Sequence, residues 1–155
     1  MSHTIQNETR SQASAQPNQW MKSRNHHLIT RMLPGADLKQ ALQEVVSTHQ
    51  LNAAALVTCV GSLKVAHLRL AGAQTTQIFE GPFEIISLVG TLSPDGVHLH
   101  LSISDKEGKV LGGHLLDGNI IHTTAEIALA IYADIAFSRP PDPETGYGEL
   151  RIQEV

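Results

Sequence analysis

The chain has 155 residues and a formal net charge of −4, and 41% of its residues are hydrophobic while 17% are charged. These values are typical of one globular domain, and no apolar run reaches the length of a transmembrane helix. Its 11 lysines and arginines are scattered along the sequence, which argues against binding DNA through a basic patch without sequence preference.

The first predicted elements follow a polar N-terminal segment. Residues 1–22 are rich in Gln, Asn, Ser and Thr without periodicity, so we expect a flexible tail followed by a single domain over residues 23–155, with Met21 as an alternative start. A first strand is predicted over residues 25–32. Apolar side chains at helical spacing predict the one principal helix over residues 37–50, capped at its start by Gly35 or Asp37.

Strand-like patterns begin at residue 53. The apolar run over residues 53–60 predicts a strand buried on both faces, and Gly61-Ser62, Gly81-Pro82 and Asp117-Gly118 predict turns, the last a tight hairpin. Further strands are predicted over residues 65–70, 75–79, 83–92, 97–104, 110–116, 120–123 and 125–132. One helix beside many strands predicts an α+β fold with a mainly antiparallel sheet.

The location is predicted from the lone cysteine and the N-terminus. Cys59 lies inside the apolar run and is expected to be a buried, unpaired thiol, and the N-terminus lacks the apolar core of a secretory signal. Both observations favour a cytoplasmic protein with no membrane association.

The strand over residues 97–104 carries the strongest chemical signal. It reads Val-His-Leu-His-Leu-Ser-Ile-Ser, and this alternation puts His98 and His100 on the same face. A three-residue loop that ends at a left-handed Gly108 would set His114 directly opposite His100 in the next strand. A four-residue loop would shift the register by one residue and turn His114 to the wrong face.

Three imidazoles so placed predict a site for a divalent transition metal, with zinc preferred and iron, nickel or copper as alternatives. Three protein ligands would leave a fourth position for water or substrate, as in catalytic zinc sites. Two observations oppose this interpretation. Histidines at alternate positions are common on the wet or interfacial face of a sheet, and a bulge at Gly112 and Gly113 would upset the register.

Three further residues are candidates for orienting the metal-binding imidazoles or for contacting a ligand. Glu126 can orient an imidazole or make a structural hydrogen bond. Arg139 can bind a ligand carboxylate through its fork of donors or form a salt bridge between subunits. Asp105 starts the turn and can also support the site electrostatically. No nucleophile elbow, phosphate loop or dinucleotide fingerprint accompanies them.

A series of short motifs in a fixed order carries a family resemblance. The motifs are Leu33-Pro34-Gly35 with Asp37, Val60-Gly61-Ser62-Leu63, Gly81 with Phe83 to Leu88, Gly90-Thr91-Leu92-Ser93, His98-Leu99-His100 with Ser104-Asp105, Gly112-Gly113-His114-Leu115, Thr124 with Glu126, and Phe137 with Arg139. Over about residues 25–151 the chain resembles the plants and prokaryotes conserved (PPC) domain family.

The resemblance implies an α+β fold that assembles as a homotrimer, and metal ligands at His98, His100 and His114. A trimer would also bury the apolar strands over residues 53–60 and 83–89, which one helix leaves uncovered, and would bring the histidines to or near a subunit boundary. The resemblance further implies DNA-binding or a transcription-associated role. The chain lacks the Arg-Gly-Arg-Pro core with which plant members enter the minor groove, and Pro82 stands where their partner-contact segment has arginine.

Three hypotheses follow. The protein is a trimeric regulatory protein with a three-histidine metal site, a metal-dependent enzyme that acts on a small ligand at that site, or an assembly module whose histidines are structural.

Overall fold

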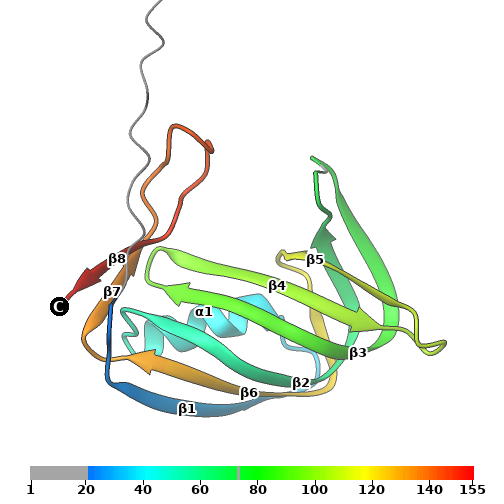
Figure 1. Cartoon of the computed structure of the whole chain (residues 1–155). Coiled ribbons are helices and arrows are strands. Elements are labelled where there is room, and N and C mark those ends of the chain that lie inside the picture. The colour runs from blue at the N-terminus through cyan, green and yellow to red at the C-terminus, as the bar shows by residue number, and fades with distance from the viewer. Residues whose placement is uncertain (1–20, 73) are drawn as a thin grey trace, which may run out of the picture.

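The computed structural model describes residues 21–72 and 74–155 (Figure 1). The elements in chain order are β1 (Asn25–Met32), α1 (Leu38–Thr48), β2 (Ala54–Arg69), β3 (Thr76–Ser93), β4 (Gly96–Ser104), β5 (Val110–Leu115), β6 (Ile120–Tyr132), β7 (Ile135–Ser138) and β8 (Arg151–Glu154). The flexible tail predicted for residues 1–22 lies, except for its last two residues, outside the described residues. The predicted first strand and the histidine strand are confirmed.

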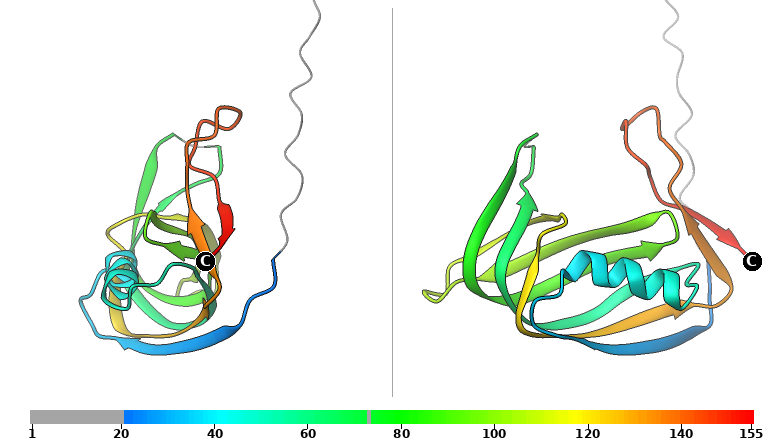
Figure 2. Two further views of the ribbon diagram at one scale, coloured as in Figure 1. Left: turned by 90° about the vertical axis from the view of Figure 1, so that its left-hand side faces the viewer. Right: turned by 180° about the vertical axis from the view of Figure 1, so that it is seen from behind.

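An antiparallel sheet and a single helix build the domain, which confirms the α+β prediction. Six strands pair in the order β1-β6-β2-β3-β4-β5, and β7 and β8 form a small second sheet. The large sheet curves, and α1 packs against one of its faces (Figure 2). An additional pairing between β2 and β5 brings the edge strand β5 back to the sheet centre, so the sheet closes partly on itself at one end.

Helix α1 forms where the apolar spacing predicts it and is capped by Asp37 rather than Gly35. The Asp37 side chain accepts hydrogen bonds from the backbone N–H groups of Lys39 and Gln40, which satisfies two donors that a helix start leaves unpaired. The residues that α1 buries against the sheet are Leu38, Leu42 and Val46. They meet an aliphatic core contributed by the strands, whose largest fully buried members include Leu63, Leu92, Leu99, Leu101, Ile103, Ile127 and Leu129.

Two predicted turns are wrong because the strands continue through them. Gly61-Ser62 lies within β2, and Gly81-Pro82 lies within β3. The ladder register shifts between Gly61 and Leu63 and again between Leu63 and Val65. These irregularities bend long strands without ending them, because a bulge absorbs a residue that does not fit the regular ladder.

The tight hairpin predicted at Asp117-Gly118 is also wrong. Strand β5 pairs with β4 and β2, whereas β6 pairs with β1 and β2, so the two strands that flank this segment are not partners. The segment is a crossing connection held from both sides. The Gly118 N–H donates to the Asp37 carboxylate at 2.5 Å, and the buried Asn119 bonds to the backbone of β2.

The sheet face opposite α1 carries large apolar side chains that are open to solvent in this chain. Val57 and Val60 are each 57% exposed, so the prediction that residues 53–60 are buried on both faces is wrong for the single chain. Ile29, Ile86 and Val89 are further exposed aliphatic residues of this face. We call these five residues the open apolar face.

Two sequence predictions concern environment. Cys59 is a free, buried thiol as predicted, and burial raises its pKa to about 12, so it stays an unreactive thiol near neutral pH. Within the described residues, the one helix is too short and too polar to cross a membrane. The cytoplasmic location stays a prediction.

Candidate metal centre

The turn between β4 and β5 sets the register of the three histidines. The Gly108 N–H donates to the Asp105 carbonyl at 3.0 Å, the Asp105 N–H donates to the Lys109 carbonyl at 3.0 Å, and Gly108 has a φ of +81°. This is the predicted three-residue loop with a left-handed glycine. It places His100 directly opposite His114, which confirms the predicted register.

Two glycines before His114 permit a close approach of strands instead of forming a bulge. The pairing of β4 with β5 runs through Gly112 and Gly113 without a register shift. A Cβ atom on Gly113 would lie 2.7 Å from the Arg69 carbonyl oxygen, which is closer than real Cβ contacts allow. Glycine therefore lets β5 lie against the end of β2, and His114 becomes the cross-strand neighbour of Arg69.

The three imidazoles converge. Their ring centroids are separated by 5.3 Å (His98 to His100), 5.2 Å (His98 to His114) and 5.5 Å (His100 to His114). One nitrogen from each ring lies within 4.8 Å of the other two. A tetrahedral zinc ion with bonds of about 2.0–2.1 Å needs nitrogens roughly 3.4 Å apart, a gap that small ring rotations close. The geometry therefore fits one divalent ion.

The surroundings of His98 and His114 favour the neutral imidazole, which is the form that binds metal. Burial lowers the pKa of His114 to about 4, and the charges of Arg69 and of the other two rings add to this effect. Burial also lowers the pKa of His98, with a further contribution from Arg139. Nδ1 of His114 is buried and has no hydrogen-bond partner among the described residues. A buried imidazole nitrogen without a partner is costly, and a bound cation is one group that would satisfy it.

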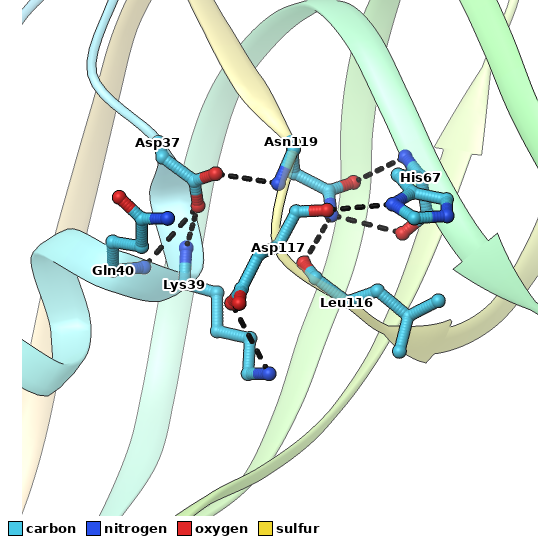
Figure 3. A network of polar contacts seen from close by, with 8 residues as sticks. Asp37, Lys39, Gln40, His67, Leu116, Asp117 and Asn119 are labelled. Atoms are coloured by element: carbon cyan, nitrogen blue, oxygen red, sulfur yellow. Dashed lines mark hydrogen bonds and ion pairs between the residues drawn. The ribbon is translucent and has the colours of Figure 1, made fainter.

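A hydrogen-bonded network fixes the chain just after His114 (Figure 3). The Asn119 side chain is fully buried, accepts from the His67 N–H at 3.0 Å, and donates to the carbonyls of His67 at 3.0 Å and Leu116 at 2.7 Å. Lys39 pairs with the Asp117 carboxylate at 3.2 Å. These contacts tie the connection after β5 to β2 and to the start of α1, so the position of β5 does not depend on strand pairing alone.

The structure brings one of the three additional candidates to the triad. Arg139 donates from Nη2 to the Thr91 hydroxyl at 2.8 Å, and Thr91 is the ladder partner of His98. Asp105 is occupied in the turn, where its carboxylate accepts from the N–H groups of Glu107 and Lys109.

Glu126 does not join the triad. It is an exposed residue on β6, paired with Arg31 of β1 and Val60 of β2, whereas the histidines lie on β4 and β5. The sequence does not reveal that β2 and β3 lie between β6, which carries Glu126, and β4, which carries His98 and His100.

A cavity of about 460 Å³ opens beside His100 and His114, and two of its lining residues escaped the sequence analysis. They are Arg69, at the end of β2, and Tyr147, in the segment between β7 and β8; the Arg69 guanidinium carbon lies 5.7 Å from the centre of the Tyr147 ring. Arg139 Nη1 donates to the Gly148 carbonyl at 3.3 Å and so holds this segment. No local motif marks Arg69 or Tyr147, since only the β2–β5 pairing and the path of the C-terminal segment bring them to the histidines.

Comparisons with known proteins place these observations in context. A family model described as the Plants and Prokaryotes Conserved (PCC) domain matches residues 21–133. The chain is 49% identical over 125 residues to proteins from two strains of Synechococcus sp. that are named bifunctional protein GlmU. The matched region covers 81% of this chain and 20% of those proteins, so the chain spans about a fifth of the length of these curated relatives.

Solved structures share the fold. A hypothetical protein from Salmonella enterica is 40% identical with a TM-score of 0.84, and the match covers 86% of this chain and 97% of that one. A metal-containing protein from Archaeoglobus fulgidus is 22% identical with a TM-score of 0.76, covering 86% and 99%. A protein from Bacteroides thetaiotaomicron described as a DNA-binding candidate is 20% identical with a TM-score of 0.69, covering 83% and 91%. At 20–22% identity the last two show the fold alone.

Proposed function

Since the chain belongs to the Plants and Prokaryotes Conserved (PCC) domain family, we propose that it is a homotrimeric metalloprotein. Each chain holds one divalent transition metal through His98, His100 and His114, and zinc is preferred over iron, nickel and copper. The observation that carries this proposal is the convergence of three imidazole nitrogens within 4.8 Å of one another. The metal content of the Archaeoglobus relative of the same fold supports it.

The test is the metal content of the purified protein. We expect about one zinc per chain by elemental analysis of wild type, and less than a tenth of that in His114→Ala, because two exposed imidazoles bind zinc weakly. His122→Ala is the matched control, since His122 is exposed on β6 and outside the triad. Wild type that is purified and dialysed against zinc without retaining a stoichiometric amount would contradict the proposal.

The chemistry available at such a site follows from its ligand number. Three protein ligands leave a fourth position at which a metal polarises a ligand oxygen or lowers the pKa of a water. A metal-dependent reaction is therefore the second candidate function, favoured by the cavity beside His100 and His114. A metabolite turnover screen tests it: identical turnover by wild type and His114→Ala would exclude catalysis at the triad.

The trimer is proposed from the open apolar face. Five large aliphatic side chains on one sheet face, among them Val60 and Val89, are more than half exposed in a single chain. Several exposed large apolar side chains on one face of a sheet are typical of an association site in proteins. Val89 is the ladder partner of His100, so the metal site would border the subunit interface.

Light scattering after gel filtration tests the assembly. We expect a trimer for wild type and a smaller species for Val60→Lys, because a charge in an apolar interface stays unpaired. Val155→Lys, at a valine beside the small sheet that is more exposed than Val60, is the control and should remain a trimer. Monomeric wild type at micromolar concentration would contradict the assembly without affecting the metal proposal.

DNA is a proposed partner only through the description of relatives such as the Bacteroides protein. The charge of −4 gives this proposal little support, because affinity for phosphates comes from clustered cations. Binding measured across salt concentrations tests it. Millimolar affinity with a shallow salt slope would remove DNA as a partner.

A further inference from the structure

The cavity beside the triad combines a cationic group, an aromatic ring and the metal position. We propose that it binds a small organic carboxylate: the carboxylate lies against the Arg69 guanidinium, and a second ligand oxygen, such as a 2-hydroxyl group, takes the open position on the metal. The inference rests on the proposed metal site and adds the class of ligand. The cavity of about 460 Å³ is in the size range of small-molecule sites.

Arg69 has its polar donors free for a ligand. In residues 21–72 and 74–155, the ion pairs use Arg24, Lys39 and Lys106, and none involves Arg69. The guanidinium carbon lies over the Tyr147 ring, 5.7 Å from its centre, and a cation–π contact of this kind does not consume the N–H donors. A half-buried arginine with unused donors beside a metal site is suited to bind an anion in a bidentate way.

The second arginine near the triad has a different task. Arg139 donates to the Thr91 hydroxyl and to the Gly148 carbonyl, so it holds the Tyr147 segment against β3. Both arginines nevertheless act on His98, where their charges help to lower the pKa, while Glu149 opposes them. With a divalent metal added, the positive charge near the cavity exceeds the negative charge, and an anionic ligand restores the balance.

The remaining walls offer apolar contact to an organic body beside polar groups. Leu70, Ala71 and Tyr147 line the cavity together with His100 and His114, and Gln74 adds an amide side chain to the lining. The distance between the two polar ends is short, because Arg69 and His114 are ladder partners. One molecule with a carboxylate and an adjacent hydroxyl oxygen can therefore reach both.

Spectroscopic titration of the cobalt-substituted protein tests the inference, with mandelate as the probe. Its carboxylate suits Arg69, its hydroxyl suits the metal, and its phenyl ring suits Tyr147. We expect mandelate to change the visible cobalt spectrum with saturable affinity, and Arg69→Gln to weaken that affinity about tenfold or more. Tyr147→Ala should weaken it less, since it removes only the apolar wall.

The control variant and the competing probes complete the experiment. Arg31→Gln, on β1 and bonded to Thr124, should bind mandelate as wild type does. Equal mandelate affinity in wild type and Arg69→Gln would overturn the inference, and so would a cobalt spectrum that responds to inorganic phosphate through Arg69 but not to mandelate. Metal content is measured on the same samples: absence of cobalt in wild type counts against the metal site, whereas full cobalt without mandelate binding counts against the carboxylate alone.

Discussion

Two histidines at the short β2–β5 pairing have opposite surroundings: His114 lies in the pairing and His67 lies next to it on β2. His67 is bonded at both ring nitrogens, Nδ1 to the Asp117 carbonyl at 2.6 Å and Nε2 to the Thr76 hydroxyl at 2.9 Å. His114 is paired across strands with Arg69, two residues after His67, and its buried Nδ1 has no partner among the described residues. The first ring is held by hydrogen bonds to the protein, whereas the second keeps a buried nitrogen without a partner in the described part of the chain.

The contrast shows how a histidine is assigned a role. Residue type and exposure do not separate these two rings, whereas the hydrogen-bond inventory does. The carbonyl of Asp117 can only accept, so His67 Nδ1 must be the donor, and the ring orientation is fixed by protein atoms. At the triad, the proposed metal would fix the rings. The predictions below separate the two roles by stability and by metal dependence.

The largest expected effect is stabilisation by zinc. At a free zinc concentration 1,000 times the dissociation constant, binding to the folded state alone adds about 4 kcal/mol to the free energy of unfolding. We expect this gain in wild type and in His67→Ala, and its loss in His114→Ala. Thermal or urea unfolding with and without zinc measures it, and a full gain in His114→Ala would contradict the assignment.

The next effect concerns the scaffold side of the comparison. Asn119→Ala removes three hydrogen bonds from a fully buried side chain and deprives the His67 N–H and the Leu116 carbonyl of their Asn119 partner, while the His67 carbonyl still accepts from the Leu116 N–H. We expect a loss of about 3 kcal/mol in the free energy of unfolding. Asn52→Ala is the control, because Asn52 is exposed, and it should change stability by less than about 0.5 kcal/mol. Similar losses for the two variants would remove the structural role given to Asn119.

In the region of the triad, the sequence predicts the features that depend on neighbouring residues and not those that depend on distant strands. The alternation in β4 and the left-handed Gly108 predict the register that brings His100 opposite His114, because a short turn fixes its own strand pairing. Whether Gly112 and Gly113 form a bulge could not be predicted from the sequence. Glycine is needed at position 113 because the chain there lies against the Arg69 carbonyl, which is distant in sequence.

Features that depend on strand order were not predictable. Asp117-Gly118 has the composition of a hairpin turn, yet it is a crossing connection, because Asp37 and Asn119 supply bonds from distant segments. Gly81-Pro82 does not end a strand, because a bulge in the long β2–β3 pairing absorbs it. Arg69 and Tyr147 carry no local motif and become visible only in three dimensions.

A smaller effect is expected for the scaffold histidine in metal-free protein. His67→Ala removes two hydrogen bonds near the surface, and we expect a loss of about 1 kcal/mol in the free energy of unfolding. Thr76→Val removes one of the two and should cost less. His114→Ala in metal-free protein should cost less than His67→Ala, because its ring makes no hydrogen bond at Nδ1. Urea unfolding in the presence of a chelator measures all three, and the reverse order would contradict the comparison.

The last effect is a pH dependence to which His114 contributes, together with His98, whose pKa is also lowered by burial. The pKa of His114 is lowered from the ordinary value of 6.5 to about 4 in the folded chain, so between these pH values the unfolded chain binds more protons. Stability of the metal-free protein therefore falls as the pH drops from about 6.5 toward 4, because protons pull the equilibrium toward the unfolded state.

Urea unfolding at pH 7 and pH 5 measures this effect. The free energy of unfolding should differ less between the two pH values in His114→Ala than in wild type, while His122→Ala should match wild type. Carboxylates contribute to the same slope in all three proteins, so the difference between variants isolates the imidazole. Equal slopes in wild type and His114→Ala would mean that the ring is hydrated in solution, and its unpartnered nitrogen would then no longer distinguish it from His67.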